Sequence, residues 1–150
     1  MNNAGRALLR PVVDVSEADW DDVIDTNLKG AFFLSQLFGR ACIAANRPGA
    51  IVSMASTHGM TGIAGRSVYG ISKAGLIQMT RMLAIEWADK NIRVNAVAPT
   101  TVMPESRQQM LSEPTARKNA LARIPSGRFA TAEEFAAAAV YRPSECAASA

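Results

Sequence analysis

Two long stretches of the chain carry apolar residues at steps of three and four positions, which predicts two amphipathic helices. The first runs from residue 16 to about residue 45, and Ser16 with Asp19 has the pattern of an N-terminal capping box. Its periodic positions are Trp20, Val23, Ile24, Leu28, Ala31, Phe32 and Ser35. The second runs from residue 67 to residue 89, and its periodic positions are Tyr69, Lys73, Leu76, Thr80, Leu83 and Trp87. Each helix is expected to bury one face against a core.

Two short apolar runs that contain β-branched residues predict buried strands. They span residues 50–54, AIVSM, and residues 92–98, IRVNAVA. A third helix is expected to begin at a capping box formed by Thr131 and Glu134. Helices and strands therefore alternate, which predicts an α/β fold with a parallel sheet and flanking helices.

The small size of this sheet bears on the domain organisation. The sequence offers two strands, whereas parallel sheets usually contain about four to six strands and are covered on both faces. We therefore expect residues 1–150 to form a single partial domain, the C-terminal part of a doubly wound parallel sheet. The segment from about residue 99 to residue 130 is rich in Pro, Ser and Arg, and its length between core elements is typical of a lid.

Composition removes several classes of function. The chain has 150 residues, a formal net charge of +3 and no block of like charges, so nothing indicates a nucleic-acid or membrane surface. No apolar run reaches the roughly 18 residues of a membrane span, and the first residues lack the apolar core of a signal peptide. Cys42 and Cys146 show neither metal-binding nor redox spacing, which favours a reduced, cytoplasmic protein without a metal site.

Tyr69 and Lys73 are the first candidates for chemistry, because residues four apart on a helix share a face. An ammonium a few ångströms from a phenol favours the phenolate, and such a tyrosine can exchange a proton with a substrate oxygen. The pair alone is a weak signal. A lysine that extends past a half-buried ring to reach solvent explains the same spacing.

Ser56 and Asn27 add to the functional interpretation. Ser56 follows the strand at residues 50–54, and ligands of parallel α/β sheets bind beyond the carboxyl ends of strands. Its hydroxyl is suited to holding a carbonyl oxygen, and a turn or cap serine is the alternative. Asn27 lies on the apolar face of the first helix, where we expect it to disturb the helix and to hold a water that leads towards Lys73. The alternative is a buried amide that ties the helix to neighbouring backbone.

Five motifs then occur in the order and spacing of one family, the short-chain dehydrogenases/reductases. They are NNAG at residues 2–5, Asn27 within DTNLKGAFF, Ser56 within IVSMAS, YGISK at residues 69–73 and IRVNAVAP at residues 92–99. The chain resembles this family from residue 2 to about residue 140, which implies a Rossmann-like fold. The resemblance implies that Tyr69 is the acid/base and that Lys73 supports it and holds the nicotinamide ribose. It also implies that Ser56 orients the carbonyl and that Asn27 completes a proton relay.

The same resemblance implies NAD or NADP as cofactor and hydride transfer between an alcohol and a ketone. The residues expected to line the cofactor are Asn2, Ala4, Gly5, Tyr69, Lys73, Pro99 and Val102. The family carries a Gly-rich phosphate turn ahead of NNAG, and no such turn precedes residue 2. We therefore expect the chain to lack the N-terminal cofactor-binding βαβ part and the extreme C terminus of the family.

Two other interpretations stand beside this one. The chain could be a catalytically inactive fragment that acts only by packing in an oligomer or on a partner. A Ser–His hydrolase built on Ser56 and His58 is the rival enzyme, but residues two apart in a loop rarely align as nucleophile and base. We expect His58 to line a substrate pocket or to be exposed. The resemblance further implies a homodimer or homotetramer formed through the helices at 16–45 and 67–89, with a small alcohol or ketone as substrate.

Overall fold

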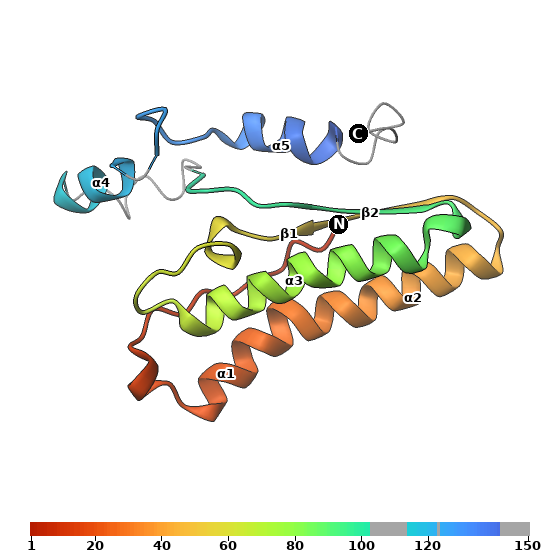
Figure 1. Cartoon of the computed structure of the whole chain (residues 1–150), viewed down its shortest axis with the longest axis horizontal. Helices are drawn as coiled ribbons and strands as arrows, with labels where there is room; N and C mark the ends of the chain where they lie inside the picture. Colours follow the sequence, from red (N-terminus) through yellow and green to blue (C-terminus); the bar gives the residue numbers. More distant parts are fainter. Residues whose placement is uncertain (103–113, 123, 142–150) are drawn as a thin grey trace.

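The computed structural model describes residues 1–102, 114–122 and 124–141 (Figure 1). Its sheet pairs β1 (Gly49–Met54) with β2 (Ile92–Val97) in parallel, in a register that runs from Gly49 opposite Ile92 to Met54 opposite Val97. Both predicted strands are confirmed, and so is their parallel pairing. The carboxyl ends of the two strands therefore lie at one edge of the sheet, where the candidate site residues follow.

The first residues of the chain also join the sheet. The sequence predicts a loop over residues 1–15, but the backbone of Asn2 pairs with β1 on the side opposite to β2. Its N–H donates to Val52 O at 2.8 Å, and its carbonyl accepts from Met54 N at 2.9 Å. This pairing holds the residues that follow Asn2 against the carboxyl end of β1.

The predicted helix at residues 16–45 is present, but it is not one regular α-helix. It consists of α1 (Glu17–Ile24), a π turn at Asp25–Lys29 and α2 (Gly30–Ala44). The capping box at its start is confirmed by hydrogen bonds in both directions between Ser16 and Asp19. The wider π turn changes which positions face inward along the helix. The apolar face is accordingly not one stripe, and Trp20 and Phe32 are each 40% exposed.

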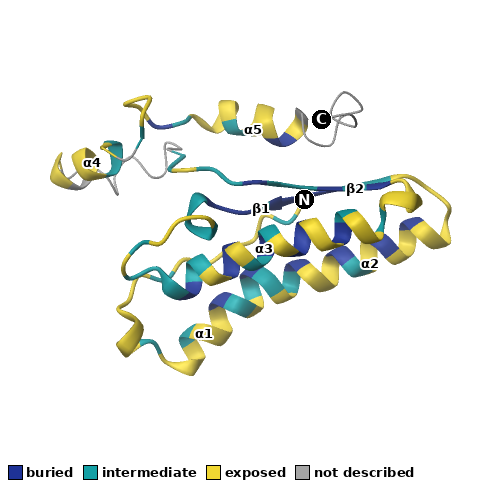
Figure 2. Ribbon diagram, viewed as in Figure 1, coloured by how far each residue is buried: buried dark blue, intermediate teal, exposed yellow. Residues whose placement is uncertain are grey.

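The hydrophobic core lies between the strands and the helices α2 and α3 (Ser67–Glu86). Its buried members are Ala31, Cys42, Ile51, Leu76, Met79, Leu83, Ile92 and Val94. Figure 2 shows the buried positions of α2 and α3 on the sides that face the strands, with exposed positions outside. Asn91 then turns the chain into β2 with φ of 55°, the left-handed conformation that Asn adopts at the end of a helical segment.

The C-terminal part contains α4 (Pro114–Leu121) and α5 (Ala132–Tyr141). In Figure 1, α5 runs on the side of the strands opposite to α2 and α3. The predicted capping box of α5 is confirmed, because Glu134 N donates to Thr131 Oγ1 at 3.2 Å and Thr131 N donates to the Glu134 carboxylate at 3.0 Å. The sequence also predicts a helical piece near residues 105–122; α4 lies in its second part, and residues 105–113 lie outside the described residues.

The described residues also show whether the chain has a membrane-spanning helix, a cluster of metal ligands or paired cysteines. None of their helices is both long and apolar enough to cross a membrane. In the same residues, no group of three or more His, Cys, Asp or Glu side chains is placed to hold a metal ion. Cys42 is buried and free, and Cys146 lies outside the described part of the chain.

Candidate active site

Lys73 is directed at the end of β1 and at the tyrosine one helical turn before it. Its Nζ donates to Met54 O at 2.6 Å and lies 5.6 Å from the centre of the Tyr69 ring. The residue is only 4% exposed, so the alternative of a lysine that reaches past the ring to solvent is wrong. Burial lowers the pKa of the Lys73 ammonium, because the charged form loses hydration. A lysine with a lowered pKa gives up its proton more readily, which suits a proton relay.

Asn27 is 1% exposed, and its amide is fully engaged. Its Oδ1 accepts from Arg6 N at 2.7 Å, while its Nδ2 donates to Arg6 O and to Ser72 Oγ, both at 2.9 Å. Ser72 Oγ in turn donates to Tyr69 O at 2.7 Å. The alternative role of Asn27, a tie between helix and neighbouring backbone, is therefore confirmed for its side chain. The expected disturbance of the helix is confirmed as well, since Asn27 lies within the π turn.

The segment at residues 2–6 passes directly over Lys73 and Asn27. A Cβ atom on Gly5 would lie 3.5 Å from Lys73 Nζ and 3.6 Å from Asn27 Oδ1. Ala4 and Gly5 are exposed, so this strip of backbone is open on its outer side. Asn2 has a different position, because its Nδ2 donates to the buried hydroxyls of Ser35 and Ser53 at 2.9 and 3.2 Å. The Asn2 side chain therefore anchors the segment and does not point to its open side.

Ser56 is connected to Tyr69 through the imidazole of His58. Ser56 caps a 3-10 turn at Thr57–Gly59, and its Oγ accepts from His58 N at 3.2 Å. The same Oγ lies 3.2 Å from His58 Nδ1. The ring of His58 meets the Tyr69 ring edge to face, with 5.6 Å between centroids and 77° between planes. Residues two apart in a loop rarely align as nucleophile and base, but here the 3-10 turn brings the imidazole into contact with Ser56 Oγ, with the direction of the hydrogen bond set by the tautomer of the ring.

Two glycines allow this turn to lie directly on α3. A Cβ on Gly59 would come within 2.7 Å of the backbone of Lys73, and a Cβ on Gly70 would come within 3.0 Å of His58 O. Neither position has space for a larger residue without a shift of backbone. The turn that carries Ser56 and His58 is therefore packed closely against the part of α3 that carries Tyr69 and Lys73.

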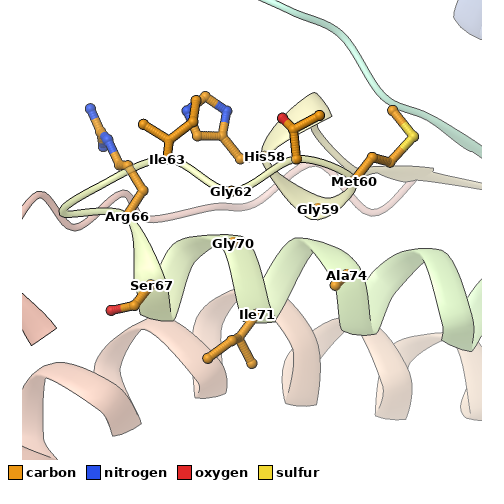
Figure 3. Close-up of a pocket in the computed structure, with 11 residues that line it drawn as sticks. His58, Gly59, Met60, Gly62, Ile63, Arg66, Ser67, Gly70, Ile71 and Ala74 are labelled. Carbon is orange, nitrogen blue, oxygen red and sulfur yellow. The ribbon is translucent and has the colours of Figure 1, made fainter.

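A cavity of about 360 Å³ lies between the loop after this turn and the first turns of α3. Figure 3 shows the loop running alongside the helix, with His58, Met60, Ile63 and Arg66 on one side and Ile71 on the other. His58 lines this cavity, and the expectation that the cavity receives a substrate stays a prediction. The cavity is lined by both polar and apolar residues, and one of them is His58, whose ring contacts Ser56.

The two remaining predicted positions follow β2. Pro99 O accepts from Thr57 N at 3.2 Å, so the chain after β2 is tied to the turn after β1. Val102 forms an isolated parallel bridge with Ala130, which joins the two ends of the segment predicted as a lid. Residues 103–113 and 123 of that segment lie outside the described residues.

Sequence patterns did not identify two partners in this arrangement. Arg6 contributes only backbone atoms, which carry no sequence signal. Ser72 could have been found, because it stands three residues after Tyr69 on the buried side of the helix. Its hydroxyl makes a link between Asn27 and the backbone of Tyr69.

Comparison with known proteins identifies the family. Residues 1–149 match the family model described as enoyl-(acyl carrier protein) reductase. The chain belongs to the short-chain dehydrogenase/reductase family. It is 39% identical over 146 residues to the NAD-dependent glycerol dehydrogenase of Listeria innocua, and 39% identical over 149 residues to the D-threitol dehydrogenase of Mycolicibacterium smegmatis. These alignments cover 97% and 99% of the chain.

The fold is confirmed by solved structures of this family. A protein of Agrobacterium tumefaciens, provisionally named 2-deoxy-D-gluconate 3-dehydrogenase and solved with bound NADP, superposes with a TM-score of 0.93 at 38% identity. The match covers 97% of this chain and 59% of that protein. The chain likewise spans 57% and 56% of the glycerol and threitol dehydrogenases. It therefore has the fold of part of a short-chain dehydrogenase/reductase, a Rossmann-like parallel sheet with flanking helices.

Proposed function

We propose that this chain supplies the catalytic part of an NAD- or NADP-dependent oxidoreductase that interconverts an alcohol and a ketone. One observation carries the proposal: Lys73 Nζ is held between Met54 O and the Tyr69 ring, at the carboxyl end of a parallel strand. Ligands of such sheets bind at this edge. The relatives support the reaction class, since two of them are named as dehydrogenases of glycerol and D-threitol.

Tyr69 is the acid/base of the proposed reaction. It gives a proton to the substrate oxygen during reduction and takes one during oxidation, and the neighbouring ammonium stabilises the phenolate that results. Ser56 lies at the strand end next to the imidazole that contacts Tyr69, and its hydroxyl would hold the same substrate oxygen. Tyr69 on α3 would thus transfer the proton, and Ser56 after β1 would orient the carbonyl.

The groups around Lys73 fit a nicotinamide cofactor. An ammonium has three N–H donors, and among the described residues Lys73 uses one of them, for Met54 O. The other donors suit ribose hydroxyls, and Tyr69 is one turn away. A nicotinamide cofactor would supply or accept the hydride. The exposed strip at Ala4 and Gly5, together with Pro99 and Val102 after β2, would line it, and Asn2 would anchor the strip.

Asn27 would contribute to this function through its side-chain oxygen or through the main chain of the π turn in which it lies. Both N–H donors of its amide are used by Arg6 and Ser72, so a water that links Lys73 to solvent could donate to Asn27 Oδ1 or bind a main-chain group of the π turn. A π turn leaves its carbonyl groups in altered positions, and such turns are frequent at functional sites. The expected proton relay from Lys73 stays a prediction on this basis.

The test uses the chain and an extended protein, in which the chain is joined to the N-terminal segment of the threitol dehydrogenase. Turnover is measured with NAD and NADP on glycerol, D-threitol and a 3-oxoacyl thioester. Tyr69→Phe should lower kcat about 100- to 10,000-fold, the usual contribution of general acid–base catalysis. Tyr141→Phe replaces the other tyrosine of the chain and serves as the control. An unchanged rate in Tyr69→Phe would show that the assigned chemistry is wrong.

Homodimer formation through the two long helices is part of the same proposal. Apolar residues are exposed on both, among them Leu37 at 59% on α2 and Ile85 at 75% on α3. Figure 2 shows the exposed outer sides of these helices next to one another. Exposed apolar surface of this kind is typical of interaction sites. Leu37→Glu or Ile85→Glu should convert the dimer to monomer in sedimentation equilibrium, whereas Val140→Glu on α5 should not.

A further inference from the structure

His58 is the single histidine of the chain, and the proposed reaction gives it no role. Its Nδ1 lies 3.2 Å from Ser56 Oγ, and its ring is in edge-to-face contact with Tyr69. It thus touches both hydroxyl-bearing residues that would act on the substrate oxygen. A titratable ring in this position can decide how those hydroxyls share their hydrogens.

The imidazole is held in place by the turn that carries it. His58 N donates to Ser56 Oγ at 3.2 Å, so the backbone and the ring of one residue meet the same oxygen. Gly59 and Gly70 let the turn lie directly against α3, where a Cβ at Gly59 would collide with backbone and a Cβ at Gly70 would make a tight contact with His58 O. The local fold therefore holds the backbone of His58 next to Ser56 and α3.

The hydrogen-bonding capacity of Ser56 allows two arrangements. A serine hydroxyl has one hydrogen to donate and can accept two hydrogen bonds. The backbone N–H of His58 already takes one acceptor position. If Nδ1 carries a hydrogen, the ring takes the second, and the hydroxyl hydrogen is left for the substrate. If Nδ1 carries none, the ring accepts that hydrogen and competes with the substrate oxygen.

We infer that His58 is a positioning residue whose Nδ1–H donates to Ser56 Oγ and thereby directs the Ser56 hydroxyl hydrogen to the substrate oxygen. This inference rests on the proposed function. It distinguishes the site from that of a serine hydrolase, in which the ring nitrogen must accept the serine hydrogen. The two arrangements differ only in which ring nitrogen carries the hydrogen, which can be measured.

The first experiment uses the chain as it is. Because His58 is its only histidine, protein labelled with ¹⁵N-histidine gives one imidazole signal pair, whose shifts report which nitrogen carries hydrogen. At about pH 8.5, where an imidazole is ordinarily neutral, the hydrogen should be on Nδ1. Ser56→Ala removes the acceptor and should move the hydrogen to Nε2. Ser67→Ala is the control, because Ser67 Oγ has no hydrogen-bond partner among the described residues and lines the same cavity.

A hydrogen found on Nε2 alone in the unaltered chain would overturn the inference. So would a spectrum that Ser56→Ala leaves unchanged, because the ring would then not depend on the serine. Neither result touches the role of Tyr69, so the proposed function is tested separately.

The second experiment measures turnover in the extended protein. His58→Ala should lower kcat about threefold to tenfold with little change in KM, the effect of losing one orienting hydrogen bond. His58→Asn keeps an amide N–H donor at this position and should restore most of the rate. In a Ser56→Ala background, His58→Ala should have no further effect, because its partner is already gone.

These kinetics also separate the two proposals. If Tyr69→Phe is inactive and His58→Ala has normal kcat, the inference about His58 is wrong and the proposed function stands. If Tyr69→Phe keeps its activity, the proposed function is wrong. Additive effects of His58→Ala and Ser56→Ala would mean that His58 acts on stability alone, and would also overturn the inference.

Discussion

Two regions of the molecule contain different kinds of polar contact. One is a cluster of polar residues near the carboxyl end of β1, called the strand-end cluster here, and the other is the C-terminal segment. The cluster consists of four buried residues, Asn27, Ser56, Ser72 and Lys73. Asn27 and Lys73 make hydrogen bonds to the backbone of other segments. In the C-terminal segment, residues 124–141, Arg128 and Glu134 form an exposed ion pair within the segment, while Ala130 bridges to Val102 and Phe129 and Ala139 are buried.

This difference separates polar contacts that are buried from polar contacts that are exposed to solvent. Buried polar groups are costly to leave unpaired, so the cluster keeps its geometry whether or not a ligand is bound. Exposed ion pairs contribute little to stability, so the Arg128–Glu134 pair adds little to the C-terminal segment. Residues 124–130 of this segment belong to the predicted lid, whose role stays a prediction.

The largest effect on stability, and so the strongest test of this comparison, is expected from Asn27→Ala. The change leaves the N–H and carbonyl of Arg6 and the hydroxyl of Ser72 without their partner. Loss of these three hydrogen bonds, one of them buried and two partly buried, should lower the free energy of unfolding by about 2–4 kcal/mol, measured by urea denaturation. The matched control is Asn119→Ala on α4, an exposed amide, which should change it by less than about 0.5 kcal/mol. Equal effects at both positions would remove the distinction between the two regions.

A smaller effect is expected from Gly59→Ala. The new methyl group would collide with the backbone of α3 at Lys73 and Ala74, and should cost about 1–3 kcal/mol of unfolding free energy, as overpacking usually does. Gly62→Ala, in the same loop, meets nothing within 4 Å and is the control. If both variants unfold at the same urea concentration, the turn is not pressed against the helix as described.

The smallest effect is expected in the C-terminal segment, from Glu134→Gln. Hydrogen bonds from the Arg128 side chain and from Thr131 N lower the pKa of the Glu134 carboxyl from 4.5 to about 2. Since the pKa is lower in the folded chain, the ionised carboxylate stabilises the fold above about pH 4.5, and this contribution is lost as pH falls through about 2. The thermal midpoint of the unaltered chain should therefore fall more steeply between these pH values than that of the variant. Glu86→Gln on α3 is the exposed control, and a slope unchanged by Glu134→Gln would refute the assignment.

Local sequence signals predicted the elements and the pairing of Tyr69 with Lys73. Strands and helices follow from apolar periodicity, and the two capping boxes follow from side-chain chemistry over four residues. The Tyr–Lys pair could be predicted because helical geometry alone brings positions four apart to one face. These features depend on residues that are close together along the chain, so they can be predicted from the sequence.

Contacts between distant segments were not predictable in the same way. Nothing in the sequence indicates that the backbone of Arg6 receives the amide of Asn27, because peptide groups are the same at every position. The contact of Ser56 with His58 depends on a 3-10 turn that two glycines allow to lie on α3. The direction of Asn2, towards Ser35 and Ser53, depends on how the first residues join β1.

The π turn at Asp25–Lys29 has a consequence for the whole surface of α2. Each residue of an α-helix turns the chain by about 100°, so removing one residue from this turn would rotate α2 about its axis by more than a quarter of a circle. Ser35 and Gly39, which are buried, would then leave the interior. A single surplus residue thus decides which side chains of α2 meet water, as far downstream as Gly39.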